Sequence, residues 1–272
     1  MGLIRALKFA RAWASARPRV LEEELEVHRQ DRTLPATLFR PGHRRSSFPG
    51  WVLLHGITRP GRRHPTLVRF ARALARSGAA VLVPEIPEWR ELLLAPEQVA
   101  DTIRASVLEM DGSPVTRGGA TGVIGFSFGA PQALIASADP SLKGHLGAVV
   151  GFGGYCDLDT TVRFLFLGEH RWHGEILRRE PDPYGRWVLG GNYLHLARGY
   201  EEAADVAEAL LALARTAGDI RRAAWEDHLD GLKRTLEERI HPDRRSLFRV
   251  FAPPAGQDPP VEAVNVLGPA LA

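Results

Sequence analysis

Residues 121–130 constrain the fold of this chain more than any other segment, because they join a strand, a sharp turn and a helix around one serine. They read Thr-Gly-Val-Ile-Gly-Phe-Ser-Phe-Gly-Ala, so that Gly125-x-Ser127-x-Gly129 follows an apolar run. Residues 131–136 then favour a helix. A side chain at either glycine would clash with the neighbouring strand or helix. The pattern therefore predicts a serine held in a strained backbone conformation.

The rest of the first half alternates between strand and helix patterns. Apolar runs and helical spacing predict strands at 24–28, 34–40, 51–54, 79–84 and 146–155, and helices at 65–77 and 96–110. The continuous apolar run at 79–84 is typical of a strand buried on both faces. This alternation predicts an α/β fold with a doubly wound, mainly parallel sheet.

Two features in this order resemble the α/β-hydrolase superfamily over residues 22–160. The turn around Ser127 resembles its nucleophile elbow, and the strand that runs into His55-Gly56 resembles its oxyanion loop. The resemblance implies that Ser127 attacks an ester, thioester or amide carbon. It also implies that the backbone N–H groups of Ile57 and Phe128 stabilise the oxyanion. The imidazole of His55 is expected to order its loop rather than to act as the base, and a merely structural Ser127 is the alternative.

The second half departs from the family pattern, which places an acid and then a histidine after the serine. Segments 201–217 and 219–240 have helical spacing and resemble a helical cap inserted after the sixth strand. A late strand is predicted at 247–252. It precedes Asp258, which mimics a family acid, although the next residues fit a helix start equally well. No histidine follows His241, so the triad is not completed in family order.

Other acids and histidines carry weaker signals. Asp157 and Asp159 could be the catalytic acid in a variant arrangement of the triad. The preferred interpretation is that they are residues at a helix N-terminus. Five histidines are expected on the cap helices or their links: His170, His173, His195, His228 and His241. A surface position is the preferred interpretation of each, and the catalytic base is the alternative. A basic group could attract an anionic substrate, but a solvated loop is the preferred interpretation of Arg40, Arg44, Arg45, Arg59, Arg62 and Arg63.

Two explanations account for the missing half of the triad. The favoured one is that these residues are a piece of a longer hydrolase, with a sheet incomplete at its C-terminus that exposes apolar surface and favours self-association. The function is then hydrolysis of a carboxylic ester or related small acyl substrate through an acyl-enzyme on Ser127. The alternative is a non-catalytic protein of hydrolase shape, which binds an apolar ligand or pairs its sheet edge with a partner.

Composition narrows the remaining possibilities. The 272 residues, 44% of them hydrophobic, suffice for a core at 21–160 with a cap region at 161–272. The lone cysteine, Cys156, favours the cytoplasm over secretion. Residues 1–20 predict an amphipathic helix that packs on the core, with contact to a membrane surface as the alternative. A net charge of +3 without a binding motif does not favour nucleic acid. Neither a metal nor a cofactor is expected, and the oligomeric state is not predicted.

Overall fold

The computed structural model of the chain describes residues 2–15, 19–42, 47–220, 224, 227–257 and 261–271. The chain divides into two compact units. The first comprises Met1–Arg90 and Ala95–Tyr155, and the second comprises Glu91–Leu94 and Cys156–Ala272. The longer segment of the second unit begins at Cys156, whereas the sequence places the division after residue 160.

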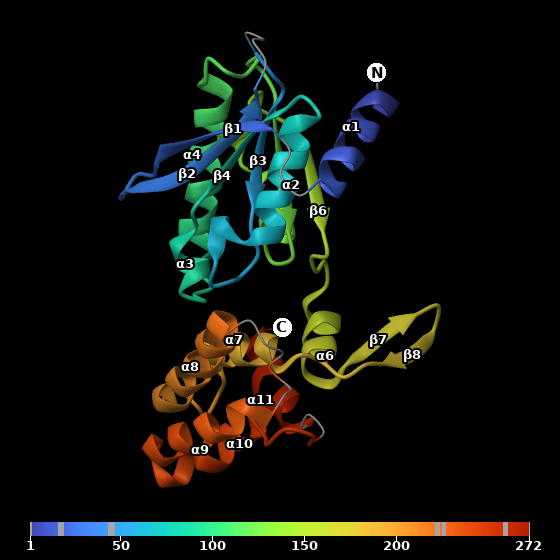
Figure 1. Cartoon of the computed structure of the whole chain (residues 1–272). Coiled ribbons are helices and arrows are strands. Elements are labelled where there is room, and N and C mark those ends of the chain that lie inside the picture. The colour runs from blue at the N-terminus through green and yellow to red at the C-terminus, as the bar shows by residue number, and fades with distance from the viewer. Residues whose placement is uncertain are drawn as a thin grey trace. The chain divides into compact units, whose positions relative to one another are not determined.

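In the described part of the first unit, six strands form one sheet in the order β1-β2-β4-β3-β5-β6 (Figure 1). The strands are β1 Val20–His28, β2 Thr33–Pro41, β3 Gly50–Leu54, β4 Ala80–Pro84, β5 Thr121–Phe126 and β6 Leu146–Phe152. Strands β4, β3, β5 and β6 run parallel, whereas β2 is antiparallel to both β1 and β4. The predicted α/β class and the mainly parallel sheet are confirmed.

Helices cover both faces of this sheet, as a doubly wound fold requires. The helices and turns of the first unit are α1 Gly2–Ala14, η1 Gly61–Arg63, α2 Pro65–Arg76, α3 Pro87–Arg90, α4 Pro96–Gly112, α5 Gly129–Ala136 and η2 Pro140–Leu142. Leu53 and Val81 face α2, whereas Val52 and Leu82 face α4 and α5. Because neighbouring residues of a strand point to opposite faces, the apolar runs of β3 and β4 fill both layers.

The two ends of the unit's chain differ in their packing. Phe9 and Trp13 of α1 lie against Phe70 of α2, and the guanidinium of Arg69 stacks over Trp13 at 4.5 Å from the ring centre. Strand β6 forms an edge of the sheet and leaves Phe152 46% exposed. None of the helices described here is long and apolar enough to cross a membrane.

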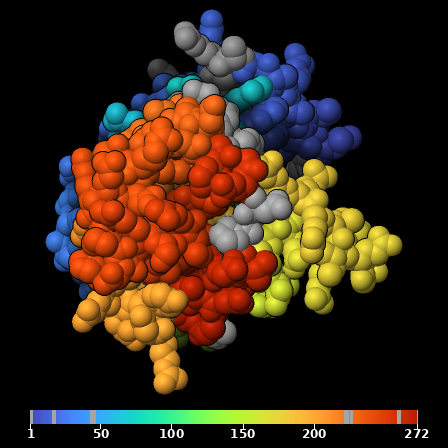
Figure 2. Space-filling view, turned by 90° about the horizontal axis from the view of Figure 1, so that it is seen from below, coloured from blue at the N-terminus to red at the C-terminus, as the bar shows by residue number. Residues whose placement is uncertain are grey.

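The second unit is mainly helical and carries one hairpin among its described residues. Its elements are α6 Leu158–Leu167, β7 Glu169–Trp172, β8 Glu175–Arg178, α7 Pro183–Tyr193, η3 Leu194–Leu196, α8 Ala204–Ile220, η4 Asp227–Leu229, α9 Asp230–Arg239, η5 Pro242–Arg244, α10 Arg245–Phe251 and α11 Val261–Leu271. Figure 2 shows the β7–β8 hairpin in yellow, projecting from the edge of this unit. The predicted helical region after strand six is present, and its role as a cap stays a prediction.

Two predictions for this unit need correction. The late strand predicted at 247–252 is wrong, because α10 buries Leu247, Phe248 and Phe251 at helical spacing. The β7–β8 hairpin lies in a region for which the sequence predicted neither a strand nor a helix. The sharp turn of the hairpin is made by His173 and Gly174, which both have positive φ.

The predicted helix at 219–240 is also wrong as one continuous element. Helix α8 ends at Ile220, and a 3₁₀ turn at Asp227–Leu229 precedes α9. Trp225, within that predicted helix, and Asp258, the candidate acid, lie outside the described residues.

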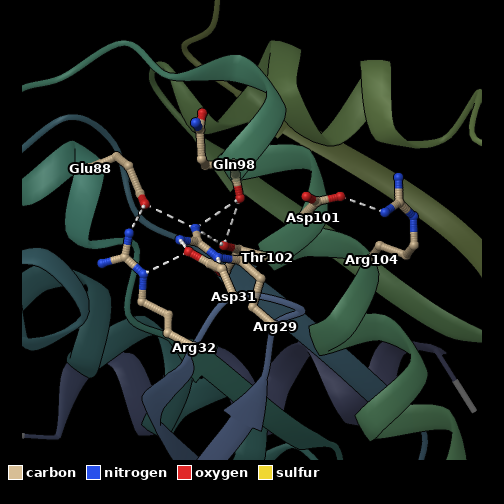
Figure 3. Close-up of polar contacts among 8 residues, drawn as sticks. All are labelled: Arg29, Asp31, Arg32, Glu88, Gln98, Asp101, Thr102 and Arg104. Atoms are coloured by element: carbon tan, nitrogen blue, oxygen red, sulfur yellow. Dashed lines mark hydrogen bonds and ion pairs between the residues drawn. The ribbon is translucent and has the colours of Figure 1, made fainter.

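A buried polar network holds the loop after β4 in place (Figure 3). The side chain of Arg29, 1% exposed, donates to Glu88 Oε1 at 2.9 Å and to the carbonyl of Gln98 at 3.1 Å. Its other donors bind both carboxylate oxygens of Asp31 at 2.5 and 2.8 Å. Glu88 lies on α3, so this network anchors α3 to the end of β1 and to α4.

We expect Arg29→Met to lower the free energy of unfolding by about 3 kcal/mol, because it leaves the carboxylate of Glu88 buried with weaker compensation. The control is Arg104→Met, which removes a partly exposed pair with Asp101 and Asp139. That loss should stay below about 1 kcal/mol. Urea unfolding of both variants measures the difference, and equal losses would contradict the prediction.

Candidate active site

Ser127 occupies the turn between β5 and α5 with the strained backbone that the sequence predicts. Its φ is +52°, in the left-handed region that residues other than glycine rarely adopt. Its N–H donates to the carbonyl of Phe152 at 2.8 Å, and its carbonyl accepts from Ala130 N at 3.0 Å. The residue is exposed. The fold therefore presents the hydroxyl-bearing side chain at the carboxyl edge of the parallel strands.

The two glycines of the motif are required by close backbone contacts. A Cβ at Gly125 would lie 2.1 Å from the carbonyl oxygen of Gly129. A Cβ at Gly129 would lie 2.7 Å from the carbonyl oxygen of His55. Both distances are shorter than any real contact. Helix α5 can therefore approach β5 and β3 closely enough to hold the turn of Ser127.

The predicted oxyanion donors lie on the two segments that flank Ser127. Residues Leu54 and Gly125 are partners in the parallel register of β3 and β5, so Ile57 and Phe128 each follow that register by three positions. A Cβ at Gly56 would lie 3.0 Å from Cβ of Ser127, which places the loop after β3 directly against the serine. Phe128 is the N-cap residue of α5, where N–H groups have no intrahelical acceptor. The fold thus brings the three candidate residues to one place.

His55 is built into the loop. Its side chain is 1% exposed, Ile86 N donates to Nε2 at 3.3 Å, and Nδ1 lies 2.7 Å from the carbonyl oxygen of Gly56. A neutral ring with the proton on Nδ1 satisfies both contacts. Burial lowers the pKa of His55 to about 4. The 3.6 Å approach of Glu85 to Nε2 is then no ion pair. The geometry agrees with an ordering role.

The aromatic residues around this loop were not predicted from the sequence. Trp89 is fully buried and packs edge-on against both His55 and Phe128, with ring centres 5.5 Å apart in each case. The ring of Tyr155 also packs against Phe128, with the ring centres 5.9 Å apart. Trp89 and Tyr155 follow β4 and β6, the neighbours of β3 and β5. Their sequence positions shortly after two predicted strands could have placed them near the site, because the carboxyl ends of parallel strands meet at one edge of the sheet.

The basic residues near this loop have separate roles. Arg62 is 5% exposed and pairs with Glu24 at 2.9 Å, so it is neither solvated nor open to a substrate. Arg59 donates to the carbonyl of Arg90 at 2.6 Å, and Arg63 is exposed. Arg40 pairs with Glu23 at 2.5 Å, whereas Arg44 and Arg45 lie outside the described residues. The solvated-loop interpretation is therefore wrong for Arg62.

Within the described ranges, no histidine or carboxylate hydrogen-bonds to the hydroxyl of Ser127. His145 pairs with Asp111 at 2.7 Å, but His145 lies at the amino end of β6, whereas Ser127 lies at the carboxyl end of the parallel strands. The length of β6 separates these two ends by about 20 Å. Asp157 caps α6 by accepting from Thr160 N at 2.7 Å, which confirms its interpretation as a helix N-terminal residue.

The five later histidines belong to the second unit. His170 lies on β7, His173 in the hairpin turn, His195 in η3, His228 in η4 and His241 before η5. In the part of the chain that is described, no group of three or more His, Cys, Asp or Glu side chains is arranged to hold a metal ion.

Comparisons with known proteins find similarity in solved structures. No family model matches the chain, and no curated protein matches it. The dienelactone hydrolase of Anabaena variabilis is 22% identical, with 54% of this chain and 68% of that one covered and a TM-score of 0.44. Brefeldin A esterase, described as a bacterial homologue of human hormone-sensitive lipase, is 17% identical to this chain. The match covers 83% of this chain and 62% of the esterase, with a TM-score of 0.43.

A third similar structure is a dienelactone hydrolase-like promiscuous phosphotriesterase from metagenomic libraries. It is 16% identical, with 50% of this chain and 59% of that one covered and a TM-score of 0.43. The chain thus spans less than two thirds of the length of this protein and of the brefeldin A esterase. The first unit has an α/β fold, with a mainly parallel sheet and a strained serine turn between β5 and α5.

Proposed function

We propose that this protein is a serine hydrolase that acts on a carboxylic ester or a related small acyl substrate. The observation that carries the proposal is the strained and exposed backbone of Ser127, with its φ of +52°. Such strain persists only where the surroundings impose it, and it is concentrated at functional sites. Gly56, Gly125 and Gly129 supply those surroundings, because each makes room for a backbone approach to the turn.

The proposed reaction passes through an acyl-enzyme. The Oγ of Ser127 forms a bond to the acyl carbon, and the carbonyl oxygen of the substrate takes up the negative charge. The N–H groups of Ile57 and Phe128 donate to this oxygen, and the N-terminal end of α5 adds a favourable dipole. The C–O bond to the leaving alcohol then breaks, and the alcohol departs with the proton that Ser127 lost. Water subsequently attacks the acyl carbon, which releases the carboxylic acid and restores the serine.

The test is the reaction with a fluorophosphonate probe, followed by intact mass and peptide mapping. We expect one adduct on Ser127 that is absent from Ser127→Ala. Ser137→Ala is a matched control, because Ser137 ends the same helix and its hydroxyl donates to the carbonyl of Leu134. Labelling of Ser137→Ala should equal that of the unchanged chain. An adduct that persists in Ser127→Ala, or a folded chain that never reacts, would contradict the proposal.

The second candidate is a non-catalytic protein of the same fold. It is favoured by the absence, among the described residues, of a base that hydrogen-bonds to Ser127. Oxyanion stabilisation alone still accelerates acyl transfer by about 10³–10⁴-fold, so slow labelling would still favour the enzyme. A folded chain that is inert over hours would favour the binding protein. The lone cysteine remains the basis for proposing a cytoplasmic setting.

A further inference from the structure

The second unit contains a small pocket that is separate from the serine turn and lined by buried basic residues. The pocket is partly open to solvent. Arg186 and Lys233 line it together with Pro183, Pro253, Ala255 and Gln257. Arg186 is 3% exposed and Lys233 is 6% exposed, so the walls hold two cations largely withdrawn from water. Buried cations of this kind normally have an anionic partner.

Lys233 has such a partner within the chain. Its Nζ donates to Asp230 Oδ1 at 2.7 Å and to the carbonyl oxygen of Pro253 at 2.7 Å. The carboxylate of Asp230 also accepts from Ala255 N at 3.1 Å. An ammonium group has three donors, so these contacts leave one for another acceptor. The charge of Lys233 is therefore balanced inside the unit.

Arg186 lacks an equivalent partner. Its Nε donates to the carbonyl oxygen of Phe251 at 2.8 Å, but its buried Nη1 has no hydrogen-bond partner. Asp182 caps Tyr184 N at 3.0 Å, and Glu180 at the pocket wall is exposed. No acidic side chain within the described ranges forms an ion pair with Arg186. The carboxylate of Asp182 attracts the guanidinium of Arg186 without forming an ion pair with it, so the described residues compensate this cation in part.

We propose that this pocket binds a small ligand through a carboxylate or phosphate group, with Arg186 as its principal donor. Both groups present oxygens at the spacing that a guanidinium fork recognises. Arg186 lies in the first turn of α7, so the positive end of that helix adds to the attraction. The third donor of Lys233 supports the same ligand. Proline and alanine walls leave room for a compact group rather than for a long chain.

Burial agrees with this assignment without weakening the charge. It lowers the pKa of Arg186 to about 10, which still leaves the side chain protonated at neutral pH. A protonated guanidinium at the wall of a small pocket offers an oxyanion a positive charge and partial exclusion of water.

The test titrates the full chain with inorganic phosphate and separately with acetate, at constant ionic strength set with chloride, and follows each probe by NMR line broadening. We expect saturable binding of at least one probe. Arg186→Gln should weaken it by about tenfold or more, because a hydrogen bond to a charged group is lost. The control is Arg171→Gln, the same change at an exposed arginine of the same unit, which should leave binding unaltered.

Two further variants make the outcome decisive. Arg186→Lys keeps the charge but loses the planar fork, so it should bind with intermediate affinity even if Arg186→Gln folds poorly. Ser127→Ala should bind both probes like the unchanged chain, which separates this pocket from the proposed hydrolase site. The proposal is overturned if neither probe binds, or if Arg186→Gln and Arg171→Gln bind equally. Preference for phosphate or for acetate identifies the group that the pocket accepts.

Discussion

Replacing Gly125 by alanine is expected to lower the free energy of unfolding by about 3 kcal/mol or more. The added Cβ would lie 2.1 Å from the carbonyl oxygen of Gly129 and 2.7 Å from Ala130 N. These are backbone atoms of α5, so relief requires the helix to move away from β5. That movement also removes the support for the turn of Ser127. We therefore expect urea unfolding at a lower midpoint, together with loss of fluorophosphonate labelling.

The matched control is Gly112→Ala at the end of α4. Nothing lies within 4 Å of a Cβ at Gly112, and its φ is not positive. Alanine there restricts the unfolded chain without a clash, so stability should be unchanged or higher by about 0.5 kcal/mol. Equal stabilities of the two variants would mean that α5 does not contact β5 as closely as the structure places it.

The second large effect is a dependence of stability on pH that arises from His55. Burial lowers its pKa from 6.5 to about 4 in the folded protein. Below pH 6.5 the unfolded chain therefore binds a proton that the folded chain does not bind until the pH nears 4. The contribution of His55 is complete above pH 6.5 and is lost as the pH falls to 4. This loss amounts to about 3 kcal/mol.

The measurement compares urea unfolding at pH 7 and pH 4 in the unchanged chain and in His55→Gln. Glutamine does not titrate, so the variant should lose about 3 kcal/mol less over this interval, whatever its stability at pH 7. Carboxylates remote from residue 55 that titrate in the same range affect both proteins and cancel in the comparison. Parallel curves for His55→Gln and the unchanged chain would show that the ring is not buried in neutral form.

The prediction at 247–252 shows where a short apolar run misleads. Leu247, Phe248 and Phe251 satisfy a buried strand as well as a helix, because a run of this length does not distinguish the two periods. Packing within the second unit decides the matter: Phe251 contacts Phe166 of α6, and its carbonyl accepts from Arg186 and Trp187. Those partners are remote in sequence, so no local pattern at 247–252 contains them.

The sequence by itself determined the strand–turn–helix at Ser127 and the two-faced burial of β4. The reason is that both depend on local sterics: on the room that Gly125 and Gly129 leave, and on an uninterrupted apolar run. Only the tertiary structure decided the fates of the charged residues. Arg62 was expected in solvent and is buried beside Glu24, Arg29 meets Glu88 from 59 positions away, and Arg186 is buried without an ion pair to any described acidic side chain. Electrostatic pairing depends on distances across the fold, and side-chain type alone does not specify those distances.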